Sequence, residues 1–186
     1  FGYLGLYGIF FLIIYSYFSH LFIAHNFIHN SIVIIFGFIY FLINLKKILK
    51  KKDSFLIFLI IFLILFVSLF MFKAHDDFPY YHFPYTYYLN QNSIIIGIGQ
   101  YNHGFRTPSS LFYLNSLFYL PFIKYHMFSM TAILIMGFSN FILIKKILNF
   151  FKSEKIDYIS YLCLLFFLFI NIFFYRIQEH GTDKSA

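Results

Sequence analysis

Long apolar segments with almost no charge constrain this 186-residue chain more than any other feature. Only 11% of its residues are charged and 61% are hydrophobic, whereas a soluble domain carries about 25% charged residues. Apolar runs of about 20 residues match the thickness of a bilayer core. We therefore predict an all-α, polytopic helical membrane protein. Its five transmembrane helices are expected at residues 1–22, 27–45, 54–72, 127–144 and 158–175.

Lysines gather in two connections between these helices, at residues 46–52 and 145–155. Lysine-rich loops beside apolar segments lie on the cytoplasmic side of a membrane. Both connections and the N-terminus are therefore expected in the cytoplasm, and the long segment 73–126 outside. We expect a multi-pass protein of a bacterial inner membrane. The net charge of +7 comes from the lysine clusters, so we expect no nucleic-acid partner.

The organisation indicates one membrane domain over residues 1–186. Because the chain starts at Phe1 and ends in a polar stretch, we expect a fragment of a longer protein. The outer segment is too long for a plain linker. Its part 109–121 is too short and polar to span a bilayer. We expect an interfacial helix there, capped by Ser109 or Ser110, with its tyrosine and asparagine side chains toward the headgroups.

Two adjacent carboxylates, Asp76 and Asp77, open this outer segment directly after an apolar stretch. Ionisable groups at such a boundary are costly and usually have a function. Repulsion between neighbouring carboxylates favours protonation of one, which suits proton abstraction near neutral pH. We therefore predict that Asp76 and Asp77 are catalytic. An exposed acidic helix cap is the simpler alternative.

Further polar side chains on the outer side are predicted to bind substrate, since helices can bring the outer loops around one pocket. Arginine suits a phosphate because its planar fork binds two oxygens at once. A loop resting on lipid headgroups and a solvated helix end are the open alternatives. The predicted substrate-binding residues are His75, Tyr81, His82, Asn102, His103, Arg106, Arg176, Glu179, His180, Asp183 and Lys184.

Metal binding has only a weak signal. His75, Asp76, Asp77 and His82 supply nitrogen and oxygen donors, but their spacing matches no tight metal motif. We therefore assign no metal ligand and no certain cofactor. A divalent cation between an aspartate and a pyrophosphate stays open. The histidines at 20, 25 and 29 are expected at the membrane interface, although the i, i+4 spacing of the last two permits a metal.

The segments 75–84 (HDDFPYYHFP) and 115–121 (NSLFYLP) together resemble the GT-C class of integral membrane glycosyltransferases. This class includes mannosyltransferase and aminoarabinose-transferase-like families that use polyprenyl-phosphate-linked sugars. The resemblance covers residues 54–145. It implies that an acidic residue in an early outer loop is catalytic, and Asp76 or Asp77 occupies that place.

The resemblance implies a transferase of the hexosyltransferase type at the periplasmic face. It would move a sugar from a polyprenyl-phosphate donor to a glycan or lipid acceptor, with an aspartate base and inverting displacement. The tail of the donor would lie among the helices beside membrane lipid. Its phosphate would meet Arg106, Arg176 or Lys184, and Tyr80, Tyr81 and Tyr85 would stack on the sugar.

Two other functions are weighed against this one. A polysaccharide polymerase or ligase relies on several arginines, whereas Arg106 and Arg176 are the only two here. A transporter places ionisable groups within its helices, which these segments almost entirely lack. A purely structural membrane protein remains an alternative.

Overall fold

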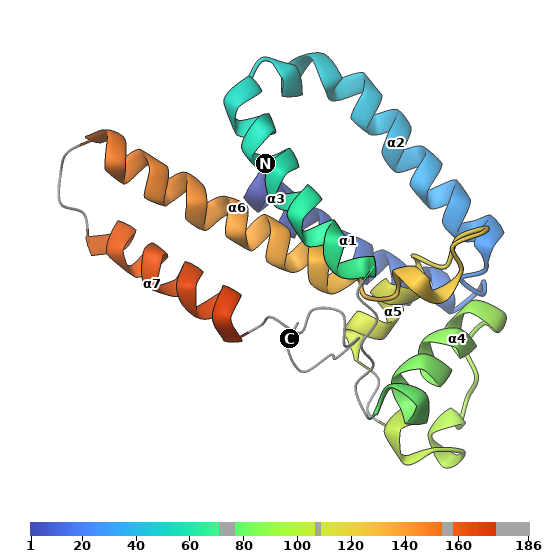
Figure 1. The fold of residues 1–186 in the computed structure, drawn as a ribbon. Helices are drawn as coiled ribbons and strands as arrows, with labels where there is room; N and C mark the ends of the chain where they lie inside the picture. The colour runs from blue at the N-terminus through green and yellow to red at the C-terminus, as the bar shows by residue number, and fades with distance from the viewer. Residues whose placement is uncertain (71–76, 107–108, 154–157, 174–186) are drawn as a thin grey trace.

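The computed structural model describes residues 1–70, 77–106, 109–153 and 158–173 (Figure 1). Within these residues all regular structure is helical and no strand is formed, which confirms the all-α prediction. Short 3-10 and π turns connect the main helices. These helices are α1 (Gly2–His20), α2 (Phe27–Leu49), α3 (Lys52–Phe66), α4 (Phe83–Gln91), α5 (Ser110–Ser116), α6 (Met130–Ser153) and α7 (Tyr158–Phe173).

Four segments of the described chain are long and apolar enough to cross a membrane: Gly2–His20, Phe27–Leu49, Lys52–Phe70 and Tyr125–Lys152. The fold is therefore that of a polytopic helical membrane protein. The first three segments lie within a few residues of the predicted spans. The fourth continues well beyond the predicted end at 144. The fifth prediction, 158–175, corresponds to α7, whose described part is a shorter apolar helix of 16 residues.

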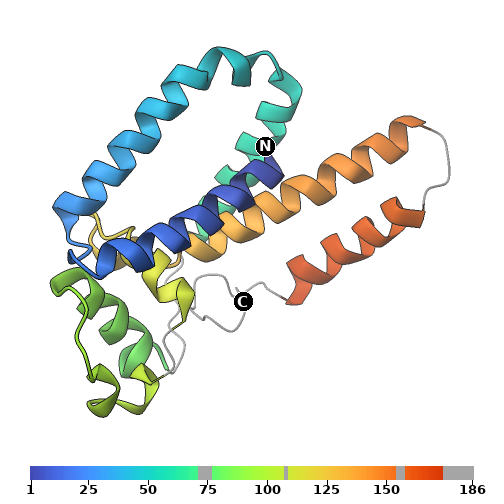
Figure 2. The same cartoon turned by 180° about the vertical axis from the view of Figure 1, so that it is seen from behind.

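Helix α6 is the centre of the bundle and packs against α1, α3 and α7 (Figures 1 and 2). The core between α3 and α6 is built from aromatic and aliphatic side chains such as Phe62 and Ile133. Asn140 and Asn171 join α6 to α7 by two reciprocal amide hydrogen bonds of 3.1 Å. Helix α2 buries only Asn30. Its middle part, residues 32–43, is apolar around the helix and largely exposed, so lipid is the expected surrounding.

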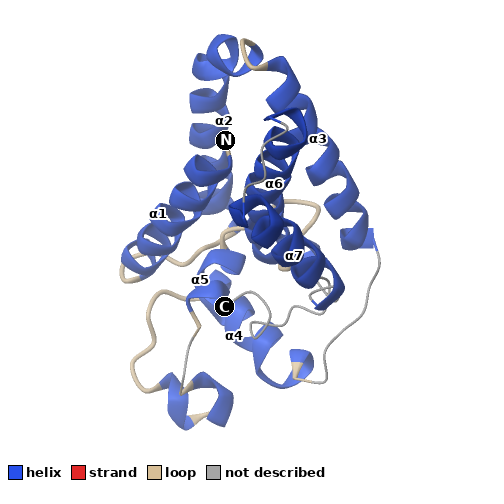
Figure 3. Cartoon of the chain, turned by 90° about the vertical axis from the view of Figure 1, so that its left-hand side faces the viewer, coloured by secondary structure: helices blue, strands red, loops and turns tan. Residues whose placement is uncertain are grey.

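The bundle has two chemically different ends. Phe58 of α3 packs near Phe141 of α6, and Phe62 packs near Phe138, so these helices are antiparallel. The start of α3 and the far part of α6 therefore lie at one end, which we call the lysine end because both lysine-rich connections are there. Helices α4 and α5 lie at the opposite end, which we call the outer end (Figure 3).

Helix α5 corrects one expectation from the sequence. Ser109 caps it as predicted, because its side chain accepts a hydrogen bond from the Leu111 backbone N–H at 3.3 Å. However, Tyr113 and Asn115 are only 9% and 7% exposed, so these side chains do not face headgroups. The helix packs against α1, α4 and α6. The predicted orientation of the tyrosine and asparagine side chains toward headgroups was therefore wrong.

Candidate functional site

The two polar clusters of the outer segment meet in the structure. The Tyr81 hydroxyl donates to Oδ2 of Asp77 at 3.4 Å, within the π turn Phe78–His82. Gly104 lies close to the Tyr81 side chain, and a Cβ added at Gly104 would overlap the Cβ and Cγ atoms of Tyr81. Asn102 Nδ2 donates to the Tyr80 carbonyl oxygen at 2.9 Å. Residues separated by more than twenty positions are therefore held together beside the Asp77 carboxylate.

The loop over residues 97–106 is shaped by its own backbone. Gly97 begins it in the left-handed region, with φ of 84°, which favours glycine. Asn102 accepts a hydrogen bond from the Gly104 N–H at 2.9 Å and starts the turn His103–Phe105. Arg106 Nε donates to the Gly99 carbonyl oxygen at 3.3 Å. This bond orients an otherwise exposed arginine, and His103 is exposed on the same loop.

The two terminal nitrogens of the Arg106 guanidinium are able to donate hydrogen bonds to a ligand. Its terminal nitrogens donate no hydrogen bond to any residue that the structure describes. A guanidinium held through Nε presents its two terminal nitrogens as a fork, and this geometry matches two oxygens of a phosphate. The predicted phosphate-binding role of Arg106 is therefore compatible with its position.

Other predicted contacts occupy different positions. His82 is buried beside Tyr81 and Phe112. Its side chain is therefore not exposed beside Arg106 and His103. Tyr85 is buried as well, and this burial raises the pKa of its hydroxyl. Its expected stacking on a sugar is therefore wrong, whereas Tyr80 is 70% exposed. The remaining predicted residues lie outside the described residues: His75, Asp76, Arg176, Glu179, His180, Asp183 and Lys184.

A second polar cluster at the outer end was not assigned a role from the sequence. His25 is fully buried in the turn between α1 and α2. Its Nδ1 lies 2.6 Å from the Ser116 hydroxyl and its Nε2 lies 2.9 Å from the Ser19 hydroxyl. Ser116 donates its own proton to the Tyr113 carbonyl oxygen at 2.6 Å. The Ser19 hydroxyl likewise donates to the Ser16 carbonyl oxygen at 3.3 Å. Each ring nitrogen of His25 therefore lies against a hydroxyl group that also bonds to a backbone carbonyl.

Burial is the main reason that the pKa of His25 is lowered to about 3, and the neighbouring His20 and His29 lower it further. The imidazole is therefore neutral at physiological pH. His29 uses its ring nitrogens on the Tyr15 hydroxyl and the Asn30 amide oxygen. Within the described residues, no group of three or more His, Cys, Asp or Glu side chains is placed to hold a metal ion.

Two asparagines complete this cluster. Asn30 Nδ2 donates to the carbonyl oxygens of His25, Ser116 and Tyr119 at 2.8, 2.8 and 3.0 Å. Asn90 Nδ2 donates to the first two of these oxygens at 2.6 and 2.7 Å. One amide comes from α2 and the other from α4, and they meet at the end of α5. The cluster therefore fixes the positions of α2, α4 and α5 relative to one another.

The sequence contained a signal for this cluster. Six polar residues lie within twelve positions between two strongly apolar segments: Ser19, His20, His25, Asn26, His29 and Asn30. Isolated polar residues at a membrane interface would not be grouped so closely in the sequence, so the grouping indicates a shared polar cluster. Their partners, Asn90 and Ser116, are too distant in sequence to be identified without the fold.

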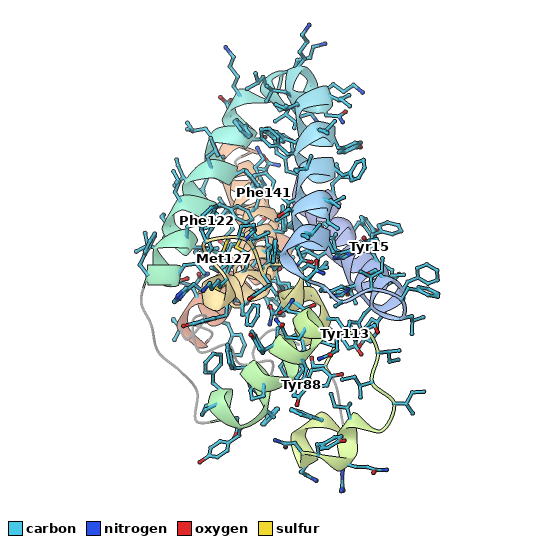
Figure 4. All side chains as sticks on the ribbon, turned by 90° about the vertical axis from the view of Figure 1, so that its right-hand side faces the viewer. Tyr15, Tyr88, Tyr113, Phe122, Met127 and Phe141 are labelled. Atoms are coloured by element: carbon cyan, nitrogen blue, oxygen red, sulfur yellow. The ribbon has the colours of Figure 1, made fainter. Side chains whose placement is uncertain are left out.

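One small cavity lies among the described residues of the outer end. A cavity of about 40 Å³ lies between His20, Tyr85, Leu89 and Tyr113, and a single water takes up about 30 Å³ in the liquid. Figure 4 places Tyr88 and Tyr113 in this outer region, whereas Phe141 lies among the spanning helices. A sugar does not fit this cavity.

Comparison with known proteins assigns the chain to a family. A family model described as a domain of unknown function (DUF8201) matches residues 3–184. No curated protein and no solved structure matches the chain. Since the family model covers nearly all of its length, this membrane protein belongs to the DUF8201 family.

Proposed function

We propose that this chain is a membrane glycosyltransferase that moves a sugar from a polyprenyl-phosphate donor to a glycan or lipid acceptor. One observation carries the proposal. The Asp77 carboxylate and the loop that bears Arg106 are joined through Tyr81 and Gly104. A potential base and a potential phosphate-binding group therefore lie in one assembled unit.

The proposed chemistry uses these two groups in turn. The carboxylate of Asp77, or of its neighbour Asp76, accepts the proton of an acceptor hydroxyl. The acceptor oxygen forms a bond to the anomeric carbon while the bond from that carbon to the phosphate oxygen breaks. The electron pair of the broken bond leaves with the polyprenyl phosphate, and the configuration at the sugar carbon inverts. Arg106 would stabilise the phosphate charge that develops.

Sidedness follows from the separation of the two ends. The lysine end would face the cytoplasm, together with the N-terminus, and the outer end would face the periplasm of a bacterial inner membrane. Both lysine-rich connections lie at the same end, which supports this orientation. Asn102 holds the backbone of Tyr80, and the exposed ring of Tyr80 offers a face for a sugar.

The test measures sugar transfer from a polyprenyl-phosphate donor pool in membranes that contain the full-length protein. Asp76→Asn and Asp77→Asn are compared at equal abundance with Asp53→Asn, an exposed aspartate in the first turn of α3 at the lysine end. We expect transfer to fall about 100-fold or more in at least one outer variant, because a general base contributes at least that much. Asp53→Asn is expected to keep full activity.

Arg106 provides a second, independent measurement. Arg106→Gln is expected to raise KM for the donor, and Arg106→Lys to restore part of the loss because charge returns without the fork. Full transfer in both Asp76→Asn and Asp77→Asn would refute the proposed base. Absence of transfer by the wild type with every polyprenyl-phosphate sugar would refute the proposed reaction.

A further inference from the structure

The lysine end contains a separate candidate site. A cavity of about 230 Å³ lies between the start of α1, the start of α3 and the far part of α6. Its apolar side is formed by residues of α1 and by Phe141 and Ile142 of α6. Since water takes up about 30 Å³ per molecule, the cavity has room for an ion the size of a phosphate group and several waters.

Within the described part of the chain, the polar side of this cavity is lined by uncharged and cationic groups. Lys51 and Ser54 come from the start of α3, and Lys145, Lys146 and Asn149 come from α6. Of the residues that the structure describes, no carboxylate lines the cavity. Three ammonium groups around one space repel one another, and an anion between them would remove that cost.

The start of α3 adds to the positive potential. Lys51 occupies the N-cap position of this 15-residue helix, and no side chain forms a capping hydrogen bond there. The first backbone N–H groups of a helix carry a partial positive charge and bind anions when they have no partner. Asp53 is the acidic residue of this first turn, but it is exposed and does not line the cavity.

We propose that this cavity binds the phosphate group of an anionic ligand, with a phospholipid headgroup as the expected source. The site lies where spanning helices end, and Figure 4 shows nitrogen-tipped side chains gathered at this end of the bundle. Basic pockets between transmembrane helices bind anionic headgroups at such positions. The proposal is independent of glycosyl transfer, because the cavity is at the opposite end from Asp77 and Arg106.

The experiment uses the purified full-length protein in phosphatidylcholine nanodiscs. Phosphatidylglycerol is titrated into one series, and inorganic phosphate or pyrophosphate is added to another. Native mass spectrometry measures bound lipid, and thermal unfolding measures stabilisation. The test variant Lys145→Gln/Lys146→Gln is compared with Lys46→Gln/Lys47→Gln, which makes the same charge change at the same end but outside the cavity.

We expect the cavity variant to bind phosphatidylglycerol about ten-fold more weakly than the wild type, and the control variant to bind nearly as well as the wild type. Lys145→Arg/Lys146→Arg should retain binding, which separates loss of charge from misfolding. Stabilisation by inorganic phosphate or pyrophosphate that the cavity variant loses would identify a soluble phosphate compound as the source. Equal weakening in both glutamine variants, or no weakening in either, would overturn the proposed site.

Discussion

Asn30 is the residue whose replacement tests the outer end most directly. Its buried amide nitrogen donates to the carbonyl oxygens of His25, Ser116 and Tyr119. Asn30→Asp keeps the shape of the side chain but puts an oxygen where this donor was. Three carbonyl oxygens would then face a fourth oxygen at distances of 2.8 to 3.0 Å.

The cost can be estimated from the bonds that are lost. Asn90 also donates to the carbonyls of His25 and Ser116, so the Tyr119 oxygen is the one that loses its described donor outright. An unsatisfied buried acceptor costs about 1–3 kcal/mol, and the part-buried Tyr119 oxygen belongs at the lower end of this range. An uncompensated buried carboxylate raises the total to about 3–5 kcal/mol. That is a large share of a typical folding stability of about 5–15 kcal/mol.

The assay compares purified wild type, Asn30→Asp and Asn44→Asp in a titration with denaturing detergent. Asn44→Asp makes the same atomic change at the other end of α2, where the half-buried Asn44 donates an exposed hydrogen bond to the Tyr40 carbonyl oxygen. Trypsin cleavage at the exposed Lys124 reports whether the segment after α5 stays docked. We expect an earlier midpoint and faster cleavage only in Asn30→Asp. Equal midpoints and cleavage rates in the two variants would refute the reasoning.

Three further changes test other parts of the structure. Gly104→Ala forces a Cβ into the Tyr81 ring and should lower sugar transfer strongly, whereas Gly37→Ala, which has open space around it, should leave transfer unchanged. Asn140→Leu removes the amide pair between α6 and α7 and should destabilise the protein by about 0.6–2 kcal/mol, measured as a shift of the detergent midpoint. The pKa of His25 is lowered from 6.5 to about 3, so the unfolded chain binds a proton that the folded chain does not. Stability should therefore fall as pH drops from 6.5 toward 3, by about 1.4 kcal/mol per unit. His25→Gln should remove that slope from the thermal midpoints.

The candidate site was predictable only in part. The sequence placed Asp77 and Arg106 in one outer segment, because both follow the third apolar stretch and precede the fourth. It did not show that Gly104 would lie against Tyr81, since that contact depends on a loop whose path is set by packing. It also suggested that Tyr85 was available to a sugar, because a tyrosine next to polar residues looks the same in sequence whether it is exposed or buried.

The sequence by itself determined the membrane class, the approximate spans and the common end of the two lysine-rich connections. Apolar length and lysine position are local properties, and the bilayer acts on each segment separately. Only the tertiary structure decided that α5 is buried, and that Asn30 and Asn90 meet around His25. In a chain this apolar, the residues that face lipid and the residues that face the protein interior are of the same types. Contacts between distant segments alone distinguish them.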